Sequence, residues 1–233
     1  VPRRRSIELH SAEAFVHVRD SSRAAVLHAL DLGARGIIIP DVQSVEEARR
    51  LVEYAKYYPL GARGFAFSRS AKYGFLPELK QIGDYFTATN QRTILMPQCE
   101  TAGALEHIEE IAALDGIDGI FVGPYDLSVA LGAPARFATP RFAEALDRVI
   151  AACRASGKLA FIYANTRAYF AQGYQGAPIA RIRPFWSRPF RACCRRNGTL
   201  QKNAKVRPPR SGNTSIKSGV IRIGRTPRFF TCC

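Results

Sequence analysis

Two acidic residues that follow consecutive apolar segments could together hold a metal ion. Glu100 ends the segment "TILMPQCE", and Asp126 comes shortly after the next apolar run, in "GIDGIFVGPYDLS". If the two runs are neighbouring parallel strands, their carboxyl ends lie side by side and the two carboxylates face each other. Two such carboxylates repel unless a proton or a cation lies between them. The pattern therefore favours a hard divalent ion with oxygen ligands and open water positions.

Simpler roles exist for each of these residues taken alone. Either acid could cap the helix that follows it, and for one isolated acid this is the better interpretation. Gln98 could be a strand-end amide with its hydrogen bonds satisfied, and Gly123 could belong to an ordinary turn. The occurrence of both acids at equivalent ends of consecutive strands is what favours a metal site.

The chain alternates short apolar runs with amphipathic stretches from residue 13 to about residue 164. The expected helices, "SSRAAVLHALDLG", "SVEEARRLVEYAKYYP" and "TPRFAEALDRVIAACRASG", open on serine or threonine and stop at glycine or proline. Short connections between strand and helix units predict parallel strands with right-handed crossovers. The expected strands are residues 15–18, 37–40, 65–67, 94–98, 120–123 and 160–164.

Two architectures fit this alternation, an open doubly wound sheet and a (β/α) barrel. No G-x-G-x-x-G motif follows the first strand, so a dinucleotide site has little support. The polar residues cluster at the carboxyl ends of successive strands, which is where a barrel places its active site. We therefore favour the barrel.

The positive charge of the chain is concentrated at one end. The formal net charge is +15, yet residues 181–233 contain 14 Lys and Arg and no acid, leaving 20 basic and 19 acidic residues to residues 1–180. The last segment has scattered prolines and no amphipathic period, so we expect a disordered basic extension. The expected domains are an N-terminal remnant (1–12), an α/β domain (13–180) and the tail (181–233).

Cysteine usage and hydropathy bear on the cellular compartment. Four of the six cysteines form adjacent pairs, and no CxxC motif occurs, so metal-finger spacing is absent. No apolar segment of 18 residues suits a membrane span. We expect a cytoplasmic protein that has no membrane partner.

Two long segments resemble one known family. "PQCETAGALEHIEEIAALDGIDGIFVGPYDLSVALG" is similar to the central signature of the HpcH/HpaI aldolase/citrate lyase family, and "LDLGARGIIIPDVQSVEEARRLVEYAKYYPLGARG" is similar to a second segment of it. The resemblance covers about residues 13–177. It implies a metal-dependent class II pyruvate aldolase on a TIM barrel, using Mg²⁺ or alternatively Mn²⁺ or Co²⁺, and a homo-oligomer if the enzyme is intact.

The resemblance also implies roles for individual residues. Glu100 and Asp126 would be the metal ligands. Gln98, Gly123, Tyr125 and Asp126 would line the pocket for the 2-oxo acid, with the amides of Tyr125 and Asp126 binding its carboxylate.

Three further residues are catalytic candidates. Asp31 matches a family acid that acts near the site, across a subunit contact, although it also suits a surface position late in a helix. The family commonly has an arginine at the end of its third strand, where an ungapped alignment puts His17. Arg19 could reach the same pocket, because residues i and i+2 share one face of a strand.

Relative to the family, the chain lacks segments at both ends. We expect a partial (β/α)8 TIM barrel without the first two strands and the last, and a tail that is foreign or frameshifted. The expected function is that of a carbon-carbon lyase cleaving 2-oxo-4-hydroxy acids to pyruvate, or a similar 2-oxo acid, and an aldehyde. The alternative is an inactive relic whose basic tail binds nucleic acid or anionic surfaces nonspecifically.

Overall fold

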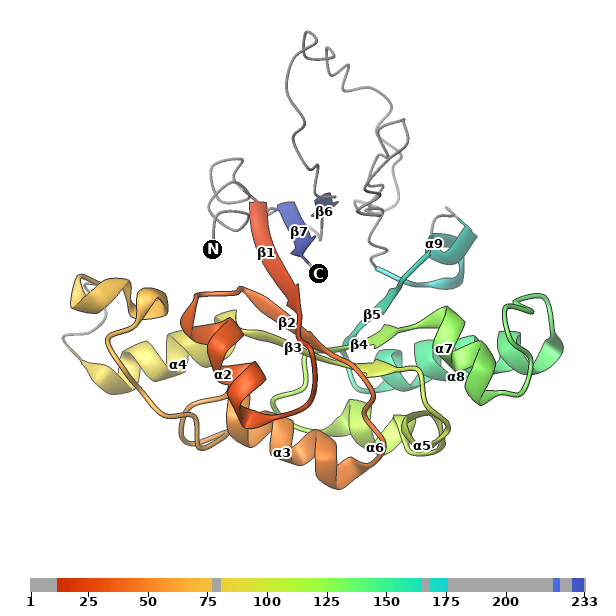
Figure 1. Cartoon of the computed structure of the whole chain (residues 1–233), viewed down its shortest axis with the longest axis horizontal. Helices are drawn as coiled ribbons and strands as arrows, with labels where there is room; N and C mark the ends of the chain where they lie inside the picture. The colour runs from red at the N-terminus through yellow and green to blue at the C-terminus, as the bar shows by residue number, and fades with distance from the viewer. Residues whose placement is uncertain (1–11, 77–80, 165–167, 176–219, 223–227, 233) are drawn as a thin grey trace, which may run out of the picture.

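The computed structural model describes residues 12–76, 81–164, 168–175, 220–222 and 228–232. These residues form a seven-stranded sheet in the order β5-β4-β3-β2-β1-β7-β6 (Figure 1). The pairs from β1 to β5 are all parallel, as the sequence predicted. The strands are β1 (Ala12–His17), β2 (Gly36–Ile39), β3 (Ile94–Cys99), β4 (Gly119–Val122), β5 (Leu159–Ile162), β6 (Val220–Arg222) and β7 (Arg228–Cys232).

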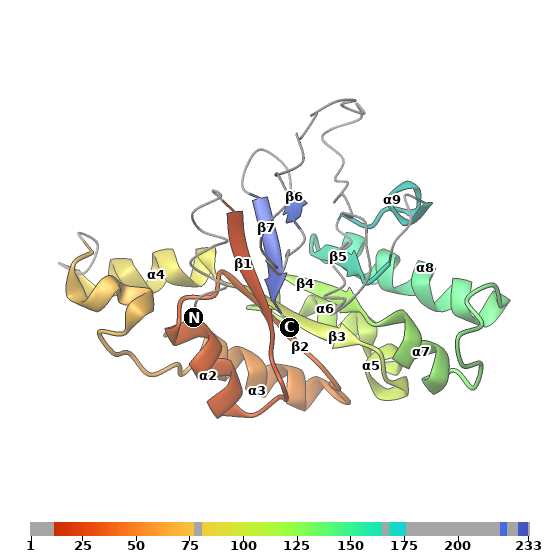
Figure 2. The same ribbon diagram turned by 45° about the horizontal axis from the view of Figure 1, so that its top comes forward.

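Helices connect the parallel strands and lie along one side of the sheet. In both views, α2, α3, α5 and α6 lie on the same side of the strands (Figures 1 and 2). None of the helices in the described ranges is long and apolar enough to cross a membrane. The helices are α2 (Arg23–Asp31), α3 (Val45–Ala55), α4 (Ile82–Arg92), α5 (Ala102–Glu106), α6 (Ile108–Ala113), α7 (Pro124–Ala130), α8 (Pro140–Ala155) and α9 (Ala168–Gln172), with a 3₁₀ segment η1 (Arg69–Gly74).

Alternate residues of the five parallel strands face opposite sides of the sheet, because side chains in a strand have a period of two. One face packs against the helices in the larger core. The other carries a separate buried layer to which each of these five strands contributes one residue. The layer consists of Phe15, Ile38, Met96, Phe121 and Phe161. An α/β fold with a parallel sheet is therefore confirmed.

The predicted helix starts are present, and their caps explain where the helices begin. Ser22, Ser44 and Thr139 each accept a hydrogen bond from the backbone amide three residues later. At the start of α3, the Glu47 carboxylate also accepts a hydrogen bond, from the amide of Gln43 at 2.9 Å.

The strand expected at residues 65–67 is wrong. No ladder forms there, and the Phe-Ala-Phe alternation instead belongs to a loop whose first phenylalanine packs on aromatic rings. Phe65 meets the ring edge of Tyr85 at a centroid distance of 5.5 Å and that of Tyr57 at 6.3 Å. Burial against α4 thus replaces the sheet partner that the alternation suggested.

Two short strands lie in the basic C-terminal segment. β7 pairs in parallel with β1 and antiparallel with β6. The remainder of the expected tail, residues 181–219, 223–227 and 233, lies outside the described residues, as does nearly all of the N-terminal remnant, residues 1–11.

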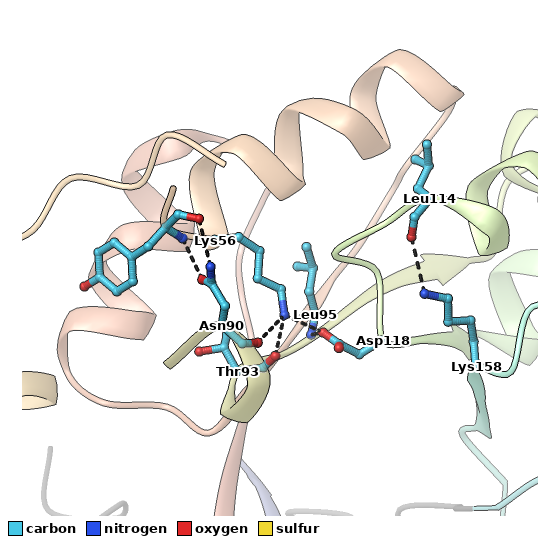
Figure 3. Close-up of polar contacts among 8 residues, drawn as sticks. Lys56, Asn90, Thr93, Leu95, Leu114, Asp118 and Lys158 are labelled. Atoms are coloured by element: carbon cyan, nitrogen blue, oxygen red, sulfur yellow. Dashed lines mark hydrogen bonds and ion pairs between the residues drawn. The ribbon is translucent and has the colours of Figure 1, made fainter. Parts of the chain in front are cut away.

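A buried lysine ties together the amino ends of two strands (Figure 3). Lys56, at the end of α3, donates to the carbonyl oxygens of Asn90 (3.1 Å) and Thr93 (2.6 Å) and to Oδ2 of Asp118 (2.8 Å). The same Asp118 oxygen accepts from the amide of Leu95 at 2.8 Å. Burial lowers the pKa of Lys56, and the charge of Asp118 opposes that shift. The starts of β3 and β4 are therefore fixed to each other.

Candidate active site

Glu100 lies directly after β3, at the carboxyl end of the sheet, and is 9% exposed. Its Oε1 atom accepts a hydrogen bond from the Asp41 amide at 2.9 Å, and its Oε2 atom accepts one from the Gln98 side-chain amide. Both oxygens thus have a donor from the protein, which fixes the plane of the carboxylate while leaving further lone pairs free.

The surroundings of Glu100 disfavour its negative charge. Burial raises the pKa of this carboxyl, and the charges of Asp126 and Asp41 raise it further, while the Asp41 amide and His17 act in the opposite direction. A cation near Glu100 and Asp126 would relieve both the desolvation and the repulsion.

Gly123 leaves space beside Glu100 that no other residue would leave. A Cβ atom at this position would lie 2.5 Å from Oε2 of Glu100 and 2.5 Å from Nε2 of Gln98. Its φ of −93° suits any residue, so the glycine is required by proximity and not by backbone conformation.

The turn after β4 brings Asp126 to the same end of the sheet. α7 starts at Pro124, and Asp126 lies in its first turn. The first hydrogen bond of α7 runs from the Leu127 amide to the Gly123 carbonyl oxygen at 2.9 Å. Tyr125 is 51% exposed, and its ring meets that of Phe137 edge-on at 5.1 Å, so Tyr125 offers the site its backbone more readily than its ring.

The three further catalytic candidates lie in different surroundings. His17 joins the site, because its Nε2 atom lies 2.8 Å from Oε1 of Gln98. Arg19 has a side chain that is 91% exposed and pairs with Asp20, away from these contacts. Asp31 accepts a hydrogen bond from the buried guanidinium of Arg63 at 2.9 Å, at the end of α2.

Asp41 is a site residue that the sequence reasoning missed. It directly follows Pro40 at the carboxyl end of β2 and has a left-handed backbone, with φ of 56°. The signal was available in principle, because Asp41 follows an apolar run just as Asp126 does. Its main contact with Glu100 runs through the backbone, and no pattern of side-chain types reveals that.

Three site residues share the face of the inner layer. Gln98 lies two residues after Met96, Gly123 two after Phe121 and His17 two after Phe15. The strand period therefore places them on the inner side of the sheet at its carboxyl end.

In the described part of the chain, no group of three or more His, Cys, Asp or Glu side chains is placed to hold a metal. Two carboxylates completed by water and substrate remain a suitable donor set for a hard ion such as Mg²⁺.

Comparison with known proteins places the chain in a family. Residues 5–180 match the model of the HpcH/HpaI aldolase/citrate lyase family. A 2-keto-3-deoxy-L-rhamnonate aldolase of Salmonella gallinarum is 34% identical over 157 residues, which are 66% of this chain and 57% of that protein.

Solved structures show the same relationship. The HpcH/HpaI aldolase from Desulfitobacterium hafniense matches with a TM-score of 0.66 and 29% identity, over 74% of this chain and 67% of that chain. An HpcH/HpaI aldolase/citrate lyase family protein from Burkholderia cenocepacia matches with a TM-score of 0.62 and 31% identity, over 69% of this chain and 63% of that chain. The chain spans a little over half the length of the curated relatives it matches. It nevertheless belongs to the HpcH/HpaI aldolase/citrate lyase family.

Proposed function

We propose that the protein is a metal-dependent carbon-carbon lyase that cleaves a 2-oxo-4-hydroxy acid to pyruvate, or a similar 2-oxo acid, and an aldehyde. The observation that carries the proposal is the buried Glu100 carboxylate, which is held at the carboxyl end of a parallel sheet and raised in pKa by burial and by Asp126. The family membership and the aldolases among its relatives support the same reaction class.

Glu100 and Asp126 would hold the divalent ion. Their all-oxygen donor set suits Mg²⁺, Mn²⁺ or Co²⁺ and does not select among them. When bound, such an ion neutralises the negative charge that develops on the keto oxygen as the carbon-carbon bond breaks.

The protein groups around the ion would bind and orient the substrate. Gln98 donates to Glu100 and so keeps the carboxylate in one orientation. The missing side chain of Gly123 leaves room for Glu100 and Gln98, and Gly123 would form this wall of the substrate pocket. The amides of Tyr125 and Asp126 would bind the substrate carboxylate. His17, positioned by Gln98, would provide a nearby hydrogen-bonding ring nitrogen.

Asp31 would contribute less directly. Its carboxylate is paired with Arg63, whose guanidinium stacks on the Tyr57 ring at 4.6 Å. In this geometry Asp31 is restrained in one position, which suits a role at a contact with another copy of the chain in a homo-oligomer. Arg19 receives no role, because it is exposed and paired with its neighbour.

The proposal is tested with Glu100→Gln and Asp126→Asn in the full chain. Each variant should lower metal-dependent release of pyruvate from a 4-hydroxy-2-oxo acid by about 10²- to 10³-fold, because each removes a charge that holds the ion. Pyruvate is followed with lactate dehydrogenase and NADH at several Mg²⁺ or Mn²⁺ concentrations.

Asp147→Asn is the matched control, since Asp147 is an exposed acid on α8. It should leave both activity and metal dependence unchanged. Full activity in Glu100→Gln and Asp126→Asn, with unaltered metal titration, would contradict the site assignment.

A further inference from the structure

The loop that follows β2 is held rigidly against the candidate site. The carbonyl oxygen of Val42 accepts from the Thr101 hydroxyl at 2.6 Å, and the amide of Gln43 donates to Glu47 at 2.9 Å. A Cβ atom on Gly103 would lie 2.2 Å from the Gln43 carbonyl oxygen, so α5 packs directly on the loop backbone. Residues 41–43 are therefore fixed between α3 and α5.

Asp41 presents a charge at the exposed surface of this loop. Its amide binds Glu100 at 2.9 Å, while its own carboxylate accepts from the side-chain amide of Gln43 at 2.7 Å. The residue is exposed, so one carboxylate oxygen is available to a ligand.

The backbone alone does not require this charge. A non-glycine residue at φ of 56° is most often Asn or Asp, because their short polar side chains bond locally in the left-handed region. Asparagine or glycine would serve the backbone equally well. The negative charge at residue 41 is therefore a separate property that can be removed without altering the turn.

The strand order indicates which part of a substrate Asp41 would meet. In the proposed function, the substrate carboxylate lies at the turn after β4 and the keto group lies near Glu100, after β3. In the sheet order β4-β3-β2-β1, the next strand end after Glu100 is that of β2, where Asp41 lies, followed by His17 at the end of β1. A substrate that follows this order would have its remaining carbons beside Asp41. Those carbons are the aldehyde half of the substrate.

We propose that Asp41 determines specificity for the aldehyde half: it accepts hydrogen bonds from hydroxyl groups of a neutral aldehyde and repels an aldehyde that carries a carboxylate. The inference rests on the proposed function, since that function sets the direction of the substrate. A carboxylate accepts hydroxyl hydrogen bonds without needing a proton of its own. Like charges in a partly desolvated site repel, and this discriminates against anionic ligands.

The test compares two five-carbon ligands that differ mainly in the group at the far end. 2-Oxopentanoate ends in a methyl group and 2-oxoglutarate in a carboxylate, so their affinities report the charge preference where the aldehyde half would lie. Calorimetry with saturating Mg²⁺ would measure both dissociation constants for the full-length wild type, Asp41→Asn and Asp147→Asn.

In Asp41→Asn, the ratio of the dissociation constant of 2-oxoglutarate to that of 2-oxopentanoate should fall by about tenfold. This effect should become smaller as the salt concentration is raised. Any uniform change in metal affinity cancels in this ratio. Asp147→Asn should leave the ratio as in the wild type, because its charge lies on α8, outside the site. If Asp41→Asn does not fold, Asp41→Gly, which also suits a positive φ, gives the same comparison.

The other outcomes overturn the inference in distinguishable ways. An equal change in the dissociation constants of both ligands would mean that Asp41 acts through Glu100 and not on the substrate. An unchanged ratio in a variant that binds both ligands would refute the inference and leave the proposed function intact. Failure of the wild type to bind either ligand would overturn the proposed function, and the inference with it.

Discussion

At the scale of single residues, the absence of a side chain at residue 123 makes room for the Glu100 and Gln98 side chains. Gly123→Ala would put a methyl group 2.5 Å from both the Glu100 carboxylate and the Gln98 amide, so one of them must move. We expect the variant to lose most of its metal-dependent activity, by about 10²-fold or more, because a small displacement of a ligand group is costly.

Gly83→Ala is the matched control for this prediction. A Cβ atom at Gly83 meets nothing within 4 Å, and the residue lies in the first turn of α4. Alanine there should stabilise the helix by up to about 1 kcal/mol and leave activity unchanged. Thermal unfolding and pyruvate release are measured for both variants; full activity in Gly123→Ala would show that the space beside Glu100 is not needed.

Residue types and spacing predicted where Glu100 and Asp126 lie in the sheet. Glu100 and Asp126 stand at equivalent ends of consecutive strands, and the pattern of the strands was enough to bring them together. The choice between His17 and Arg19 was beyond that reasoning, because β1 ends at His17 and the same-face rule no longer applies two residues later. Asp41 was missed because its contact with Glu100 depends on a positive φ.

At the scale of elements, the Lys56 cluster fixes the end of the sheet opposite to the candidate site. Lys56→Met should destabilise the protein by about 3–5 kcal/mol, because it leaves Asp118 and two backbone carbonyls without their buried partner. The free energy of unfolding is measured by urea denaturation with both arms of the transition resolved.

Lys158→Met provides the comparison within the same region (Figure 3). Lys158 makes a single long contact, 3.5 Å, to the carbonyl of Leu114, so its loss should cost less than about 1 kcal/mol. Similar losses in the two variants would show that the ammonium of Lys56 contributes no more than a surface charge.

Three helix starts were predictable, because capping residues act locally. Ser22, Ser44 and Thr139 determine their helices through bonds within three residues. The loop at residues 65–67 was not predictable, since its alternation is satisfied by aromatic rings from distant segments. The break at His107, which divides α5 from α6, also lacks a glycine or proline signal.

At the scale of the whole molecule, the buried carboxylate of Glu100 couples cation binding to stability. A divalent ion that binds only the folded state stabilises it by about 2.7 kcal/mol at a hundred times its dissociation constant. Adding Mg²⁺ or Mn²⁺ to metal-free protein should therefore raise the melting temperature of the wild type and of Asp147→Asn. Glu100→Gln should show no such rise.

Calorimetric scans with and without chelator make this measurement. Equal stabilisation of the wild type and Glu100→Gln would assign the ion to another site.

The fold class was predictable at this scale because alternating strand and helix patterns specify parallel pairing. The pairing of β7 with β1 was not, since residues 228–232 lie in a segment with no helix or strand period.

The order of β1 to β5 in the sheet is also their order in the chain. Each of these four strand pairs therefore joins a strand to the next one in the order of synthesis, and a helix is synthesised between the two. Pairing can proceed during synthesis from the N-terminal side, and no strand of this set has to wait for a distant partner. Nascent chains would acquire the carboxylate end of the site in stages: Asp41 first, then Glu100, and Asp126 last.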